Sequence, residues 1–158
     1  AYLLCDYDEY YFGGDTISHD QLIRLTKRAE IVNKFYEENK STARDQAAVV
    51  IHVDSRSIGK RIDIFFYHHD GSSTGEKLAS NLQETIRQKY AAAQPGRGYH
   101  GTVKTRDLFM LRNTFPPTVF LELGNIRNRA DQRRFIITNN RQAMANWICD
   151  GLIEVYGK

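Results

Sequence analysis

Two segments of the sequence end an apolar run on a side chain that can do chemistry. AAVVIHVDS, residues 47–55, places His52 after five apolar residues, and TVFLE, residues 118–122, ends on Glu122. Runs of this length predict strands covered on both faces, as in a parallel sheet. Because sites in α/β folds lie beyond the carboxyl ends of strands, we expect this imidazole and carboxylate at one sheet edge. There the histidine could hold a metal ion that activates water, and the glutamate could take the proton.

Each residue also has a purely structural interpretation. Histidine is only intermediate in its tendency to be buried, so His52 alone is more simply explained as a core residue bonded to a backbone carbonyl. A carboxylate inside an apolar run is costly to bury without a partner or a chemical role, which weakens that interpretation for Glu122. The pair, rather than either residue alone, therefore indicates a site.

The other histidines do not complete a metal site around His52. His68 and His69 are adjacent on a predicted strand, so they point to opposite faces and cannot both bind one ion. We expect both at the surface. His100 lies in a loop rich in glycine, and His19 follows a predicted helix cap and should face solvent.

Size and composition predict one folded domain. The chain has 158 residues, of which 41% are hydrophobic and 26% charged, as in ordinary globular proteins. No apolar run approaches the roughly 20 residues of a membrane span. The net charge of +3 is scattered along the chain, without the basic stripe that nucleic-acid binding requires. Neither a membrane span nor a nucleic-acid partner is predicted.

The order of the elements predicts an α/β fold: a single domain with a largely parallel sheet and helices on both faces. Helix starts are predicted from two capping boxes, Ser18 with Gln21 and Ser73 with Glu76. Arg133 and Arg134 are expected on the solvent face of a short helix. The predicted strands are residues 47–53, 61–69 and 118–125, with a strand that passes into a loop at 1–12 and a short strand or strand-turn at 107–114. The later helices are predicted at 128–136 and 139–156.

These segments resemble the zinc-dependent N-acetylmuramoyl-L-alanine amidases of the cell-wall hydrolase type, the amidase type 3 family. AAVVIHVDS resembles that family's strand ending in Ser-Ile-His-Ala-Asn/Asp. TVFLELGNIRNRADQRRF, residues 118–135, resembles its Glu-x-Gly-Phe-x-x-Asn segment with a following aspartate and short helix. RAEIVN (28–33), GEKLASNLQ (75–83) and FMLRNTFPPTVFLE (109–122) match other family segments in the same order. The resemblance covers essentially the whole chain.

The resemblance implies a hydrolase that cuts the amide between N-acetylmuramic acid and L-alanine in peptidoglycan or muropeptides. In the family, Zn²⁺ is held by His, Glu and His and keeps an open position for water. By match, His52 is one of those ligands and Glu122 is the general base. His100 would border the substrate cleft, and Asn125, which stands where the family usually has Phe, would lie in the substrate groove. The expected location is periplasmic or extracellular, associated with the cell wall.

The sequence also departs from the family. The family's first strand, with Asp-Pro-Gly-His-Gly-Gly, and a glutamate before its first helix supply the other two zinc ligands, and neither segment is present. Residues 1–158 are therefore expected to be an amidase-like catalytic domain that is incomplete at its N-terminus and inactive as it stands. One alternative is a non-catalytic peptidoglycan-binding or regulatory module with a degenerate amidase fold. Another is a hydrolase of the same fold that acts on a different amide.

Overall fold

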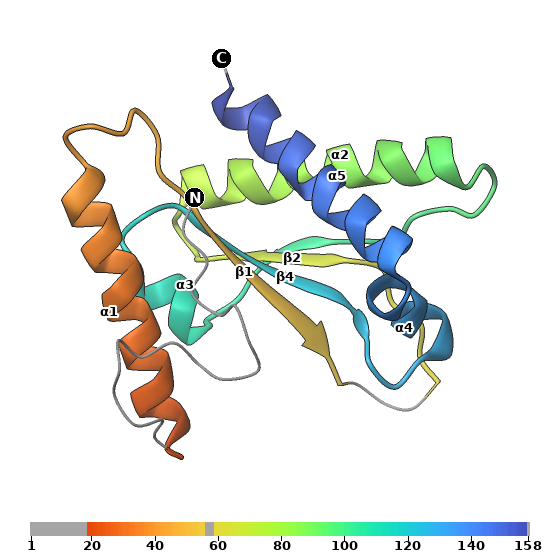
Figure 1. Ribbon diagram of the computed structural model, residues 1–158, viewed down its shortest axis with the longest axis horizontal. Helices are drawn as coiled ribbons and strands as arrows, with labels where there is room; N and C mark the ends of the chain where they lie inside the picture. The colour runs from red at the N-terminus through yellow and green to blue at the C-terminus, as the bar shows by residue number, and fades with distance from the viewer. Residues whose placement is uncertain (1–18, 56–58, 158) are drawn as a thin grey trace.

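A computed structural model describes residues 19–55 and 59–157 of the chain. The predicted strand 1–12 and Ser18 of the first predicted capping box lie outside these residues. The described elements, in chain order, are α1 (Gln21–Asn39), β1 (Ala48–Asp54), β2 (Phe65–His68), α2 (Ser73–Ala93), β3 (Val103–Thr105), α3 (Phe109–Asn113), β4 (Thr118–Asn125), α4 (Arg129–Ile136) and α5 (Thr138–Tyr156) (Figure 1).

The four strands form one mixed sheet in the order β1-β4-β2-β3. The β1–β4 and β2–β3 pairs are parallel, and only the central β2–β4 pair is antiparallel. The predicted α/β domain with a largely parallel sheet is thereby confirmed. Because of the antiparallel pair, β1 and β4 end at the edge of the sheet where β2 and β3 begin.

The main core lies between the sheet and two long helices. Figure 1 shows α2 and α5 together on one side of the sheet, and α1 with α3 on the other. Side chains alternate along a strand, so Val119 and Leu121 of β4 enter the α2–α5 core. Phe120 and Glu122 therefore face the opposite side. A Cβ at Gly151 of α5 would stand 2.8 Å from Leu82 Cδ2, so glycine permits the close crossing of α5 over α2.

Both helix caps differ from the prediction. Asp20 caps α1, since its side chain accepts hydrogen bonds from the backbone N–H groups of Leu22 and Ile23. Ser72 caps α2 by accepting from the N–H of Gly75, so Ser73 is the first residue of the helix and not its cap. Two adjacent serines offer the same hydroxyl chemistry, and only the backbone geometry decides between them.

The region before β4 also differs from the prediction. The predicted strand 107–114 is wrong, because Phe109–Asn113 forms the helix α3, and a short apolar run alone does not separate strand from helix. The strand β3 has only three residues, too few to show a period of two, and was not predicted. Among the described helices, none combines the length and apolar character needed to cross a bilayer.

Candidate functional site

His52 and Glu122 lie directly opposite each other on the parallel strands β1 and β4. Nδ1 of His52 is 3.7 Å from Oε2 of Glu122. The His52 side chain is 60% exposed, whereas that of Glu122 is only 9% exposed. The structure thus brings together the two predicted residues, with the imidazole open to solvent and the carboxylate beneath it.

A β-bulge follows the pair. His52 pairs with Glu122, but two residues later Asp54 pairs with Asn125, three residues along β4. The backbone N–H of Ile126 then donates to the Asp54 carbonyl at 2.8 Å, which joins the two strands beyond the bulge. Bulges bend a strand and redirect its side chains, and they are common beside active sites.

The environment of His52 favours its protonated form in the absence of a metal. The polar contact with the Glu122 carboxylate, reinforced by charge attraction, raises the pKa of the His52 imidazole above its usual value. Partial burial and the Arg28 guanidinium oppose this rise. The imidazole also packs on the Phe120 ring, with 5.3 Å between the ring centroids and 36° between the planes. Contacts on two sides therefore restrict the orientation of the ring.

The Glu122 carboxylate has an unused acceptor. Its Oε2 atom is buried and has no hydrogen-bond partner among the described residues. A buried acceptor left unsatisfied is costly, so the site suits an approaching proton donor or cation. Within residues 19–55 and 59–157, however, no group of three or more His, Cys, Asp and Glu side chains could hold a metal ion. The pair therefore fits one part of a metal site and not a complete one.

Asn125 stabilises the turn after β4. It is fully buried, and its side-chain Nδ2 donates to the carbonyl of Lys60 at 2.7 Å. Its side-chain Oδ1 accepts from the N–H of Arg127 at 2.9 Å. These bonds hold the turn against the segment that precedes β2. The contact with substrate that the sequence suggests for Asn125 stays a prediction.

His100 lies in the loop that enters β3, and hence at the same sheet edge as the ends of β1 and β4. The residue is exposed. Its backbone N–H donates to Oδ2 of the buried Asp63 at 2.7 Å, which fixes the position of the loop. Its predicted contact with substrate also stays a prediction.

Arg134 is buried, so the prediction of a solvent-exposed side chain is wrong. Nη1 donates to the carbonyl oxygens of Ile62 at 2.9 Å and Leu123 at 3.0 Å, and Nη2 lies 3.1 Å from Oδ1 of Asp63. The guanidinium thereby links the residue after Glu122 to the carboxylate that holds the His100 loop. The short polar helix α4 gave no sign in the sequence that one of its arginines faces inward.

Asp131 joins the same cluster from the preceding turn of α4. Its fully buried Oδ2 accepts from the N–H groups of Ile62 at 2.8 Å and Asn125 at 3.1 Å. Oδ1 is 3.2 Å from Nη2 of Arg134. A Cβ at Gly124 would lie 2.9 Å from Nη1 of Arg134, so a larger residue here would collide with the buried guanidinium. Close packing against Arg134 therefore explains why a glycine stands two residues after Glu122.

Comparison with known proteins identifies the family. The family described as N-acetylmuramoyl-L-alanine amidase matches residues 15–154 of the chain. No curated protein matches the sequence.

Solved amidase structures share the fold. The CwlD amidase from Clostridioides difficile, in complex with the GerS lipoprotein, superposes with a TM-score of 0.69 at 18% identity, over 95% of this chain and 71% of that one. Ami1 from Mycobacterium smegmatis superposes with a TM-score of 0.66 at 22% identity, over 84% of this chain and 60% of that one. AmiC2 of Nostoc punctiforme superposes with a TM-score of 0.62 at 21% identity, over 80% of this chain and 64% of that one. The chain spans less than two thirds of the length of the last two. From the match over residues 15–154, the chain belongs to the N-acetylmuramoyl-L-alanine amidase family.

Proposed function

We propose that the protein, in its complete form, hydrolyses the amide between N-acetylmuramic acid and L-alanine in peptidoglycan, in the periplasm or outside the cell. The observation that carries this proposal is the His52–Glu122 pair, with a buried, unsatisfied Glu122 oxygen 3.7 Å from the imidazole. An exposed nitrogen ligand beside a protected base is the arrangement that metal-assisted hydrolysis needs. The family membership supplies the class of bond.

We propose further that the site uses zinc. His52 would donate one imidazole nitrogen, and the remaining ligands would come from outside the described residues, since these contain no set of three. Bound zinc lowers the pKa of water and polarises a carbonyl oxygen. The packing of the His52 ring on Phe120 would limit its rotation and so help to orient the nitrogen.

Glu122 would move the proton. Its Oε2 would accept a proton from the attacking water and then give it to the nitrogen of the leaving L-alanine. Burial keeps bulk water away from this oxygen and leaves the carboxylate with few alternative orientations. His100, which is exposed at the same sheet edge, would contact the glycan or peptide, and Asn125 would shape the groove through the turn that it holds.

The 158-residue chain alone should show no appreciable amidase activity. His52 is the one ligand that we propose among the described residues, and one imidazole does not make a catalytic zinc site. The measurement is digestion of purified muropeptides with added zinc, followed by chromatography of the released peptide. Turnover comparable to that of a complete family enzyme would contradict this expectation.

Replacing His52 by alanine in the complete protein should abolish zinc retention and leave the fold intact. The side chain is mostly exposed, so its removal creates no cavity in the core. Metal analysis after dialysis measures the zinc, and circular dichroism checks the fold. His69→Ala, a histidine substitution at the opposite edge of the sheet, provides the control. Unchanged zinc in His52→Ala would remove this residue from the ligand set.

A second candidate is a non-catalytic module that binds peptidoglycan and retains the amidase fold. The absence of a three-ligand set among the described residues favours it. The two candidates differ in a direct assay, since a module would bind insoluble peptidoglycan without releasing peptide, with or without zinc. A hydrolase for a different amide would leave muropeptides intact and cleave another acyl-amino bond.

A further inference from the structure

A pocket of about 530 Å³ lies at the other edge of the sheet from Glu122. It is formed where β2 ends and α2 begins, and β3 provides another wall. Because β2 runs against β4, the carboxyl ends of β2 and β3 lie at the edge where β1 and β4 start. The pocket is therefore separate from the candidate amidase site and needs an explanation of its own.

The floor of this pocket is His68, which is only 6% exposed. The prediction that His68 lies at the surface is wrong, because it follows Phe66 by two positions and shares the sheet face that α2 covers. Its Nδ1 lies 3.0 Å from the carbonyl oxygen of His69. A carbonyl can only accept, so Nδ1 carries the hydrogen, and in the neutral ring Nε2 keeps its lone pair. No described residue forms a hydrogen bond with Nε2.

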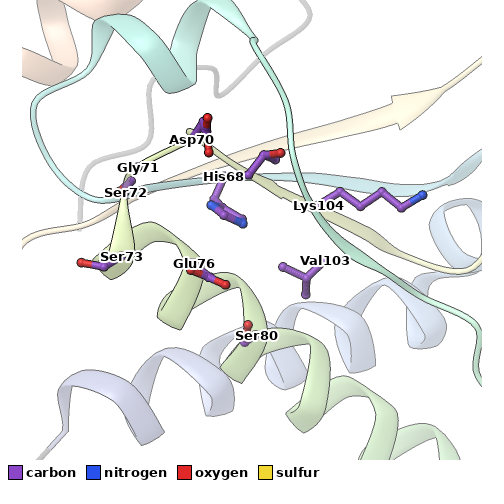
Figure 2. Close-up of a pocket in the computed structure, with 10 residues that line it drawn as sticks. His68, Asp70, Gly71, Ser72, Ser73, Glu76, Ser80, Val103 and Lys104 are labelled. Carbon is purple, nitrogen blue, oxygen red and sulfur yellow. The ribbon is translucent and has the colours of Figure 1, made fainter.

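Two side chains of α2 point toward the same space. Glu76 and Ser80 are four residues apart and hence on one face of the helix. Figure 2 shows the His68 ring, the Glu76 carboxylate and the Ser80 hydroxyl converging, with the Val103 side chain beside them. In the same view Lys104 extends away from this space. Three hydrogen-bond acceptors and one apolar wall therefore surround the interior of the pocket.

We propose that this pocket binds an aliphatic primary ammonium group, such as a lysine-type side chain of a peptide. An ammonium has three N–H donors and no acceptor, which matches the acceptors on His68, Glu76 and Ser80. The Glu76 carboxylate supplies the opposite charge and makes its hydrogen bond charge-assisted. Val103 would contact the methylene groups next to the ammonium, as apolar surfaces do along lysine stems.

The surrounding charges include both signs. Asp70 adds a second carboxylate to the pocket wall. Lys104 and the N-terminus of α2 would favour an anion instead. The positive end of the α2 dipole is partly compensated, because the Ser72 side chain accepts from the N–H of Gly75 and Glu76 lies in the first turn of the helix. We infer a cation, since the groups that converge in the interior are acceptors.

The 158-residue chain allows a direct test by nuclear magnetic resonance. Titration of the ¹⁵N-labelled protein with Nα-acetyl-L-lysine amide should show binding in the millimolar range, with shifts at His68, Glu76, Ser80 and Val103. The Nα,Nε-diacetyl analogue, which has the same chain without the charge, should not bind. Glycinamide tests the source of the ammonium: tighter binding of the lysine probe assigns a side chain, and tighter binding of glycinamide assigns a peptide terminus.

Variants at exposed positions complete the test without disturbing the core. Glu76→Gln should weaken binding of the lysine probe by about tenfold or more, because a charge-assisted bond is lost. Ser80→Ala should weaken it by a smaller factor, and Glu84→Gln, on the same helix outside the pocket, should have no effect. The proposal is overturned if no amine shifts these resonances. It is equally overturned if inorganic phosphate binds there in their place and Lys104→Ala abolishes that binding.

Discussion

In the zinc-dependent amidase that we propose, replacing Glu122 by glutamine should leave zinc bound and lower the rate of muropeptide cleavage by about 10² to 10⁴, the usual contribution of a positioned general base. Glutamine keeps the size of the side chain and one acceptor oxygen, but it cannot take the proton from water. The carboxylate is buried opposite His52, so the replacement fills the same space without exposing the core.

The test of Glu122 requires two measurements on the same preparation, zinc content and cleavage rate. Glu84→Gln, an exposed substitution of the same type on α2, controls for general effects of losing a carboxylate. Loss of zinc together with activity would make Glu122 a ligand instead of a base. Full activity would remove it from the mechanism and count against the proposed reaction.

Replacing Asp63 by asparagine should lower the free energy of unfolding by about 3–5 kcal/mol, the cost of breaking a buried ion pair by removing one partner. The Asp63 carboxylate is 7% exposed, and it pairs with the guanidinium groups of Arg97 and Arg134 and accepts from His100 N–H. The variant would remove the counter-charge that Arg97 and Arg134 share, and Arg134 would keep its ion pair with Asp131. Urea unfolding of the 158-residue chain measures the loss.

The same carboxylate should make the stability fall in acid. Burial by itself would raise the pKa of Asp63, but the His100 N–H and the guanidinium groups of Arg97 and Arg134 outweigh it and hold the pKa below its usual value. A carboxylate whose pKa is lower in the folded state stabilises that state. This contribution is fully present at pH values above its unfolded pKa of about 3.9. That contribution is lost as the pH falls through the lower, folded value. Below about pH 4, the free energy of unfolding of Asp63→Asn should therefore decline less than that of the parent chain.

A matched control for Asp63 is Asp107→Asn. Asp107 also pairs with an arginine, Arg112, but its side chain is 73% exposed. Exposed ion pairs contribute about 0–1 kcal/mol to the free energy of unfolding. This variant should therefore unfold at nearly the same urea concentration as the parent chain. Equal losses in the two variants would show that burial of the Asp63 cluster has no special effect.

The strands that carry the candidate site could be predicted because their signal is local. The apolar runs that end at His52 and Glu122 already indicate parallel neighbours, and the structure pairs these two residues directly. The prediction that both strands are covered on both faces is wrong for β1, which lies at the end of the described strand order with Ile51 57% exposed. Their proposed roles as base and ligand come from the residue types and the family resemblance, and not from the strand pattern.

The buried charge cluster could not be predicted from the same sequence. Arg134 meets Asp63, which is 71 positions earlier in the chain, and nothing in the polar pattern of α4 indicates such a partner. His68 was missed for a related reason, because whether a histidine at a strand end is buried depends on the helix that begins above it. In both cases packing against another element, and not the local sequence pattern, sets the outcome.

The single antiparallel pairing between β2 and β4 has a consequence for how the sequence could evolve. It places the loops around His52 and Glu122 at one edge and the His68 pocket at the other, on opposite faces of the sheet. Energetic effects of substitutions that share no contacts are usually additive. Selection could therefore alter the proposed ammonium pocket without changing the proposed amide chemistry, so that one scaffold would accommodate two independently adjustable specificities.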